Sequence, residues 1–226
     1  MKHLLDRPVW SALQTRHAAL AEGSRLAKRY PASIAPFAAT EKDDDESLRE
    51  LAELAPPGVN LLLVKSDEII LPAGFVTVSA ASGVQMIADK PLQEADDERI
   101  EQLGEADAAE MLALATLTKP GPFSLRAQSL GKFWGVKVEG RLVAMAGERM
   151  KQPGYTELSG VCTHPDFRGE GLGKLLSLYV AGKIFARSEQ PYLHAYATNT
   201  GAIGLYASIG FRLRSTMNIA VVSRPA

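Results

Sequence analysis

Two hydrophobic periods occur in the first 90 residues of the chain and predict a small α/β unit. Apolar positions recur at helical spacing between Pro8 and Gly23, so we expect an amphipathic helix of about four turns there. Residues 60–64, 75–79 and 84–88 are apolar runs of strand length, and Ser82-Gly83 has the composition of a turn between the last two. The polar stretch 91–97 then predicts a linker.

The pattern after residue 98 predicts a larger sheet with helices. From residue 132 the period becomes two, and Glu139-Gly140-Arg141 predicts a hairpin with a short turn. In the following strand, 155–163, strict alternation would place Leu158, Gly160 and Cys162 on one face and Glu157, Ser159 and Val161 on the other. The other expected elements are strands at 99–103, 192–197 and 211–222, and helices at 106–117, 174–187 and 200–209.

A glycine-rich loop, Arg168-Gly-Glu-Gly-Leu-Gly173, joins the strand at 155–163 to the next helix. Glycines at a helix start let backbone N–H groups converge on an anion, and the helix dipole adds about half an elementary charge, so a phosphate is the expected ligand. A Walker A loop is excluded, because Arg168 stands in place of its first glycine and Leu175 in place of its hydroxyl. The dinucleotide fingerprint is also excluded, because Lys174 stands in place of its third glycine.

The spacing Arg168-x-x-Gly171-x-Gly173 resembles the [Q/R]-x-x-G-x-[G/A] pyrophosphate loop of the GNAT superfamily of acyl-CoA N-acyltransferases. Two further segments carry the resemblance: Val161-Cys-Thr-His-Pro165, similar to the end of the family's fourth strand, and Asn199 to Phe211, similar to N-x-x-A-x-x-L-Y-x-x-x-G-F. The resemblance covers about residues 98–226. It implies an α/β (α+β) GNAT fold with a mixed, mostly antiparallel twisted sheet and helices on both faces. The unit at 1–90 would precede this fold and resembles a degenerate half of it.

The resemblance also implies a reaction and its residues. An amine would attack the thioester of acetyl-CoA directly, with Tyr206 as proton donor to the leaving sulfur, Glu157 as base, and an N–H near Val161 holding the oxyanion. No metal is implied, and the four histidines show no metal-ligand spacing. The residues expected to bind coenzyme A are Val161, Cys162, Thr163, Arg168, Gly169, Glu170, Gly171, Leu172, Gly173, Lys174 and Asn199.

Several of these roles have alternatives. Asn199 could cap the following helix instead of binding pantetheine, and Glu157 could be a surface residue. Glu170 replaces a residue that is often basic in the family, so we expect it to point into solvent. A cysteine nucleophile at Cys162 with His164 as base is disfavoured, since no third orienting group is evident. A non-catalytic CoA-binding or protein-interaction module of the same fold is the alternative to an enzyme.

Composition and charge limit the classes of protein to which the chain can belong. The chain has 25 basic and 26 acidic residues, which argues against a dedicated nucleic-acid or membrane-surface protein. A single cysteine and the lack of a signal-peptide pattern lead us to expect a cytoplasmic protein, monomeric or homodimeric. The expected acceptor is a small-molecule or peptide amine. Arg126, Arg212 and Arg214 in the segments expected to shape its pocket hint at a carboxylate on that amine.

Overall fold

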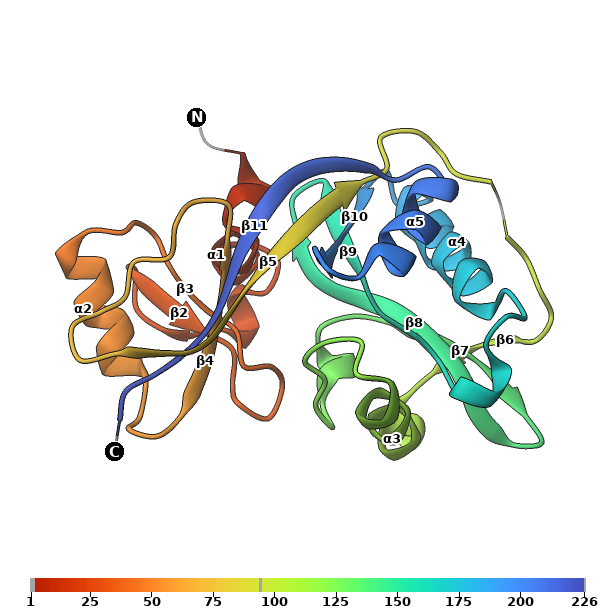
Figure 1. The fold of residues 1–226 in the computed structure, drawn as a ribbon, viewed down its shortest axis with the longest axis horizontal. Coiled ribbons are helices and arrows are strands. Elements are labelled where there is room, and N and C mark those ends of the chain that lie inside the picture. Colours follow the sequence, from red (N-terminus) through yellow and green to blue (C-terminus); the bar gives the residue numbers. More distant parts are fainter. Residues whose placement is uncertain (1–2, 94, 226) are drawn as a thin grey trace.

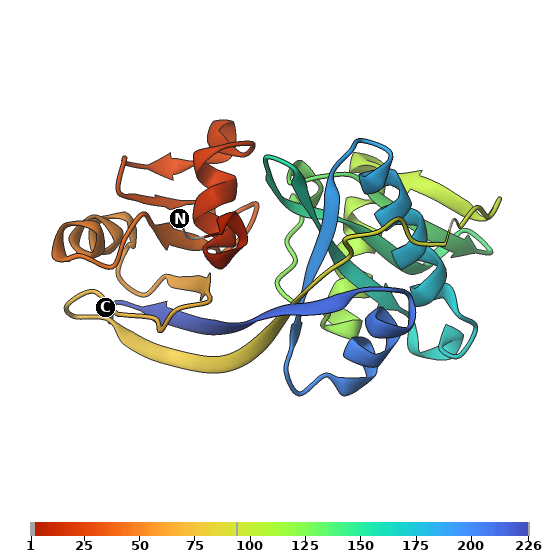
Figure 2. The ribbon, with the colours of Figure 1, turned by 90° about the horizontal axis from the view of Figure 1, so that it is seen from above.

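An eight-stranded sheet crosses the whole molecule (Figures 1 and 2). The computed structural model describes residues 3–93 and 95–225. Neighbouring strands are antiparallel except β9 and β10, which are parallel. The predicted mixed, mostly antiparallel sheet is therefore confirmed. In spatial order the strands are β4 (Asn60–Lys65), β11 (Arg212–Ser223), β5 (Val76–Ile87), β10 (Gln190–Tyr196), β9 (Tyr155–Thr163), β8 (Arg141–Gln152), β7 (Phe133–Val138) and β6 (Ile100–Leu103).

Helices cover both faces of the part of the sheet that is formed by strands after residue 98 (Figure 1). Helix α3 (Ala108–Thr118) packs its Met111 against Met145 of β8. On the other face, α4 (Leu172–Phe185) packs its Leu176 against Ala144 and Ala146, the strand neighbours of Met145. The short helix α5 (Thr200–Ser208) joins the cluster under α4. The predicted helices at 106–117, 174–187 and 200–209 are confirmed to within a few residues.

The N-terminal part adds a small sheet and two helices beside β4 (Figure 1). Strands β1 (Glu22–Gly23), β2 (Ala27–Arg29) and β3 (Ala38–Thr40) form the small sheet, flanked by α1 (Pro8–Gln14) and α2 (Asp45–Leu54). The four-turn helix expected from Pro8 is wrong in length, because α1 has only 7 residues. Beyond the end of the helix, His17 is 4% exposed and hydrogen-bonds the Tyr30 hydroxyl at 2.8 Å.

The long strands β5 and β11 run side by side from one part of the molecule to the other (Figure 2). The predicted turn at Ser82-Gly83 is wrong, because β5 is continuous through it. Gly83 serves close packing instead, since a Cβ there would lie 2.8 Å from Cδ1 of Ile219 on β11. Strand β5 precedes the predicted linker 91–97, whose residue 94 lies outside the described residues, and pairs with β10 and β11, which follow it. The sheet is thus continuous across the proposed division between residues 1–90 and 98–226.

A bulge in β9 shapes the middle of the sheet. Gly160 and Val161 lie opposite a single β8 residue, Ala146, and Gly160 has φ +65°. A Cβ at Gly160 would also lie 2.9 Å from the Phe133 ring. The expected alternation over 155–163 is therefore wrong. Leu158 packs under α4, while Cys162, four residues later, packs on the opposite face under α3.

The neighbouring hairpin follows the sequence prediction. Residues Glu139 and Gly140 connect β7 to β8 and have φ values of +51° and +78°, as the two-residue turns that suit twisted hairpins require. No helix within residues 3–93 and 95–225 combines the length and the apolar character needed to cross a membrane.

Candidate active site

The glycine loop offers a row of unpaired backbone donors. Gly169 and Gly171 have φ values of +88° and +78°, and α4 begins directly after them at Leu172. The Arg168 amide bonds to the Pro165 carbonyl, but the six amides of residues 169–174 donate to no group among the described residues. Six consecutive free N–H groups, three of them at the start of a 14-residue helix, are the kind of donor set that suits a diphosphate.

Side chains leave the loop open. A Cβ at Gly169 or Gly171 would find no protein atom within 4 Å. Arg168 and Glu170 are exposed, as expected for Glu170, and the Arg168 side chain has no hydrogen bond or ion pair in the described part of the chain. Lys174 is exposed on the first turn of α4. The loop can therefore receive an anion, with Arg168 and Lys174 free to add charge.

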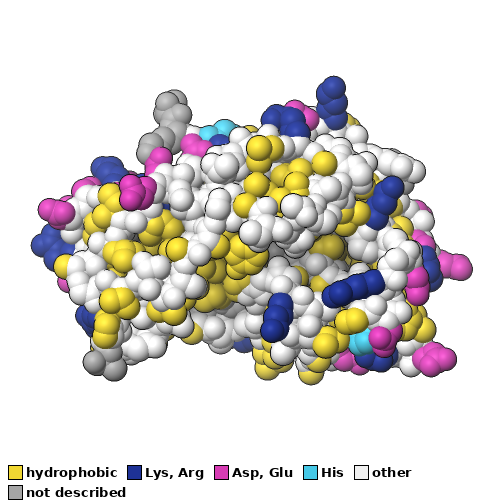
Figure 3. Space-filling model, in the orientation of Figure 1, with side chains coloured by type: hydrophobic (Ala, Val, Ile, Leu, Met, Phe, Trp, Pro, Cys, Tyr) yellow, Lys and Arg dark blue, Asp and Glu magenta, His cyan; other side chains and the backbone are white. Residues whose placement is uncertain are grey.

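A pocket begins where β9 and β10 part. The two strands pair only over Tyr155–Glu157 and Gln190–Tyr192, so the edge of β9 beyond Glu157 has no strand partner on this side. Val161 lines the pocket from β9, and Ala195 and Tyr196 line it from β10. Figure 3 shows a hollow between the two parts of the molecule in which hydrophobic side chains gather. An unpaired strand edge facing a pocket can pair with an extended ligand arm as an added strand would.

Tyr206 lies at this pocket, on the last turns of α5. Its side chain is 8% exposed, and its ring packs edge-on against Phe211 with centroids 6.0 Å apart. No described residue hydrogen-bonds its hydroxyl. Burial, with a smaller effect of nearby Cys162, raises the pKa of Tyr206 to about 12, so the phenol keeps its proton at neutral pH.

Asn199 also lines the pocket, at the start of α5. Its Oδ1 accepts a hydrogen bond from the Ala202 amide at 3.2 Å, which is the N-cap arrangement. The capping alternative for Asn199 is therefore confirmed. Its amide nitrogen donates to no group among the described residues, so one residue can cap the helix and still offer a donor to the pocket.

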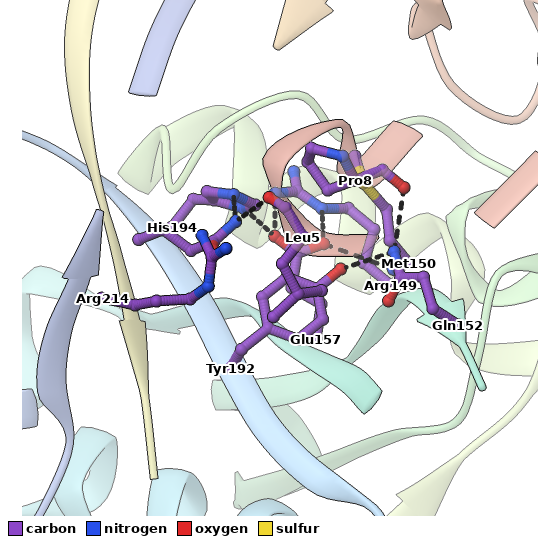
Figure 4. A network of polar contacts seen from close by, with 10 residues as sticks. Leu5, Pro8, Arg149, Met150, Gln152, Glu157, Tyr192, His194 and Arg214 are labelled. Atoms are coloured by element: carbon purple, nitrogen blue, oxygen red, sulfur yellow. Dashed lines mark hydrogen bonds and ion pairs between the residues drawn. The ribbon is translucent and has the colours of Figure 1, made fainter. Parts of the chain in front are cut away.

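Glu157 is fully buried, and its carboxylate accepts hydrogen bonds from Arg149, His194 and the Met150 amide (Figure 4). Arg149 donates to both of its oxygens, from Nε at 2.8 Å and Nη2 at 2.6 Å, and His194 donates from Nδ1 at 2.7 Å. Burial alone would raise the pKa of Glu157, but the Arg149 charge and these hydrogen bonds hold the pKa far below its usual range. Arg149 and His194 line the pocket, whereas Glu157 lies behind them. A molecule in the pocket can therefore reach Glu157 only through Arg149 or His194.

The orientation of His194 is fixed by the N-terminal segment (Figure 4). The Gln85 amide nitrogen donates to the Leu5 carbonyl and lies 2.9 Å from His194 Nε2, while Arg214 donates to Gln85 Oε1. Because the Gln85 oxygen accepts from Arg214, the Gln85 atom next to His194 Nε2 is its amide nitrogen, which donates. His194 Nε2 is therefore the acceptor, and Nδ1 carries the proton.

Comparison with solved structures decides the family. A crystal structure of a GNAT-family protein from Novosphingobium aromaticivorans is similar to this chain over 100% of both chains, with 41% sequence identity and a TM-score of 0.94. The chain belongs to the GNAT family. A GCN5-related N-acetyltransferase from Kribbella flavida shares the fold, with a TM-score of 0.66 at 16% identity over 100% of this chain and 97% of that one. The family model described as FR47-like protein matches residues 135–219, and no curated protein matches the chain. Acetyltransferases among these relatives support an N-acetyltransferase role in general.

The position of Cys162 does not suit a nucleophile. Its side chain is buried under α3, and burial raises the pKa of the thiol to about 11. His164 is turned toward Arg141 and the Asp166 amide. Cys162 and Thr163 can thus contribute only their backbone and the Thr163 hydroxyl to a ligand on this strand. No group of three or more His, Cys, Asp or Glu side chains able to hold a metal occurs among the residues the structure describes.

Some pocket residues of this GNAT protein could not be found from the sequence. None of the three arginines expected near the acceptor, Arg126, Arg212 and Arg214, lines the pocket. Arg212 pairs with Asp89, and Arg214 pairs with Asp6. The charged residues at the pocket are instead Lys119 and Arg149. Neither Lys119 nor Arg149 belongs to a sequence motif. The N-terminal residues of the pocket wall are Phe37, Leu62 and Val64, and from the sequence alone they look like ordinary core residues.

Proposed function

We propose that this GNAT protein transfers the acetyl group of acetyl-CoA to a primary amine. The amine nitrogen attacks the thioester carbonyl carbon to form a tetrahedral intermediate; the C–S bond then breaks, giving the amide and the thiol of coenzyme A. The observation that carries this proposal is the set of six unpaired amides at 169–174 on one side of the β9–β10 gap, with the free Tyr206 phenol at the pocket on the other.

The co-substrate fits these residues along its length. The amides of 169–174 would receive the diphosphate, with Arg168 and Lys174 adding charge. The unpaired edge of β9 at Val161–Thr163 would pair with the pantetheine arm, and the Asn199 amide nitrogen would donate to the same arm. This arrangement directs the thioester into the pocket, where an N–H near Val161 would hold the oxyanion.

Tyr206 is the proposed donor to the departing sulfur. A thiol has an ordinary pKa of about 8.5, below that of the buried phenol, so Tyr206 acts by donating a hydrogen bond as negative charge develops on sulfur. When the C–S bond breaks, its electron pair goes to sulfur, and the thiolate held by this hydrogen bond then takes its proton from solvent.

The proton lost by the amine is assigned to His194, which Glu157 holds in place. An ammonium with a pKa of about 10.4 must be deprotonated before it can attack. His194 lines the pocket, and Glu157 fixes its Nδ1–H at 2.7 Å and compensates a positive charge on the ring. Glu157 is thus a positioning residue in this proposal, and Gln85 must release Nε2 for the ring to accept a proton.

Thermal melting with acetyl-CoA, together with thiol release in the presence of pooled amines, tests the proposed function. Acetyl-CoA at 100 times its dissociation constant is expected to stabilise the protein by about 2.7 kcal/mol. Stabilisation without thiol release from any amine would indicate the non-catalytic CoA-binding module. The absence of stabilisation would contradict both.

We expect Tyr206→Phe to lower kcat about 100-fold with little change in the affinity for acetyl-CoA, since the lost hydroxyl acts on the reacting sulfur. Steady-state kinetics and calorimetric binding measure the two effects. Tyr179→Phe, on α4 against Trp134, is the matched control and should leave both values unchanged. Equal kinetics for Tyr206→Phe and the parent protein would exclude Tyr206 as the donor.

A further inference from the structure

The acceptor side of the pocket carries positive charge without a matching acid. Lys119 and Arg149 line it, and no Asp or Glu side chain does so among the described residues. Glu157 pairs with Arg149 from behind the pocket wall, and no ion pair joins Glu157 to Lys119 among the described residues. A polycationic acceptor such as a polyamine would therefore meet repulsion and no carboxylate in this pocket.

Arg149 keeps one donor group directed away from its ion pair. Its Nε and Nη2 serve Glu157, while Nη1 has no partner in the described part of the chain. The guanidinium carbon lies 4.9 Å from the centroid of the Phe37 ring, and the side chain is 15% exposed. Stacking and the ion pair thus fix a largely desolvated cation whose remaining N–H groups can bind an anion.

Lys119 stands at a constrained position on the pocket rim. It ends α3 with φ +51°, a left-handed conformation that is uncommon for a residue other than glycine, and Pro120-Gly121-Pro122 follows it. Its amide bonds to the Ala115 carbonyl, but its ammonium has no ion pair or hydrogen bond with any described residue. The chain therefore holds an uncompensated cation at the entrance of the pocket.

One part of the pocket wall is apolar and comes from the N-terminal part. Phe37, Leu62 and Val64 are at most 8% exposed, and each lines the pocket. Met150 and Ile219 continue this surface. An acceptor that fills the space gains by burying apolar surface against these side chains, at roughly 25 cal/mol per Å².

We propose that the acceptor is an amino acid with an apolar side chain, whose carboxylate is bound by Lys119 and Arg149. This inference rests on the proposed acetyl transfer and names the substrate of the same site. The amine reacts at the thioester, the carboxylate meets the two cations, and the side chain packs on the wall formed by Phe37, Leu62 and Val64.

Matched acceptors test the class. With acetyl-CoA, kcat/KM for L-leucine should exceed that for isoamylamine, its analogue without the carboxylate, by about 10-fold or more, since each lost charge-assisted bond leaves a cation unpaired. Glycine should be poorer than leucine, and spermidine poorest. Equal values for leucine and isoamylamine, or a preference for spermidine, would overturn the inference.

The variant Lys119→Met separates the carboxylate contact from the rest of the site. The ratio of kcat/KM for leucine to that for isoamylamine should fall about 10-fold, with unchanged acetyl-CoA affinity. Lys183→Met, an exposed lysine of α4 over the Tyr179 ring, is the control and should leave the ratio as it is. An unaltered ratio in Lys119→Met would contradict the assignment. Transfer to amines with the wrong ranking refutes only the acceptor class, whereas no transfer to any amine refutes the proposed function as well.

Discussion

Replacing Glu157 by glutamine is expected to lower the free energy of unfolding by about 3–5 kcal/mol. Glu157 is fully buried and accepts two hydrogen bonds from Arg149 and one from His194. The substitution removes the charge but keeps the volume, so it leaves the Arg149 guanidinium without its counter-charge in a largely desolvated place. Urea denaturation measures the loss.

Two control variants test whether the loss of stability comes from breaking the buried ion pair. The double variant Arg149→Met/Glu157→Gln removes both charges, and should recover at least half of the loss, because replacing a buried pair entirely costs far less than breaking it. Glu22→Gln, which breaks an exposed pair with Arg29, should change the free energy of unfolding by no more than about 1 kcal/mol. A loss from Glu157→Gln as small as that from Glu22→Gln would contradict the buried pair.

The ion pair between Glu157 and Arg149 also makes the free energy of unfolding depend on pH. The pKa of Glu157 in the folded protein lies far below the ordinary glutamate value of about 4.3, because Arg149 and His194 favour the ionised form despite burial. Its contribution to stability is therefore complete above that value and declines as the pH falls below it. The difference in the free energy of unfolding between the parent protein and Glu157→Gln should become smaller as the pH is lowered.

Replacing Gly173 by valine is expected to weaken coenzyme A binding by about 100-fold, or 2.7 kcal/mol. A Cβ at Gly173 would meet the Thr163 hydroxyl oxygen at 3.7 Å and a Val161 methyl at 4.0 Å, both ordinary contacts, so the fold can accept the side chain. The same Cβ points between the loop and the open edge of β9, where the diphosphate and pantetheine would lie. Isothermal titration calorimetry measures the change.

Gly182→Val is the matched control, since Gly182 lies on the same helix and a Cβ there would find nothing within 4 Å. Both substitutions replace a helical glycine by a β-branched residue, so their effects on helix propensity should be similar. If both variants bind coenzyme A as the parent protein does, the ligand does not pass between the loop and β9.

The loop and the elements after residue 98 could be predicted because their determinants are local. Glycines at fixed spacing between a strand and a helix define the loop, and Glu139-Gly140 defines a hairpin turn within two residues. Gly83 and Gly160 show where such reasoning ends. The first allows Ile219 to approach from a distant strand, and the second forms a bulge beside Phe133, so neither is a turn.

The acceptor side of the site could not be predicted, because it is assembled by long-range pairing. Phe37 meets Arg149 only because β4 and β5 join β11 in one sheet with the C-terminal strands. The burial of Glu157 likewise depends on Arg149 and His194, which come from the two strands flanking β9. The residue type at one position does not indicate which residues from distant parts of the chain will contact it.

The central claim is that the amides of residues 169–174 bind the diphosphate of coenzyme A. Titrating ¹⁵N-labelled protein with coenzyme A, and separately with pantetheine, which lacks the diphosphate, observes these amides directly. The largest chemical-shift changes with coenzyme A should occur at residues 169–174, and pantetheine should leave those resonances nearly unchanged. Resonances of 169–174 that stay in place at saturating coenzyme A would contradict the claim.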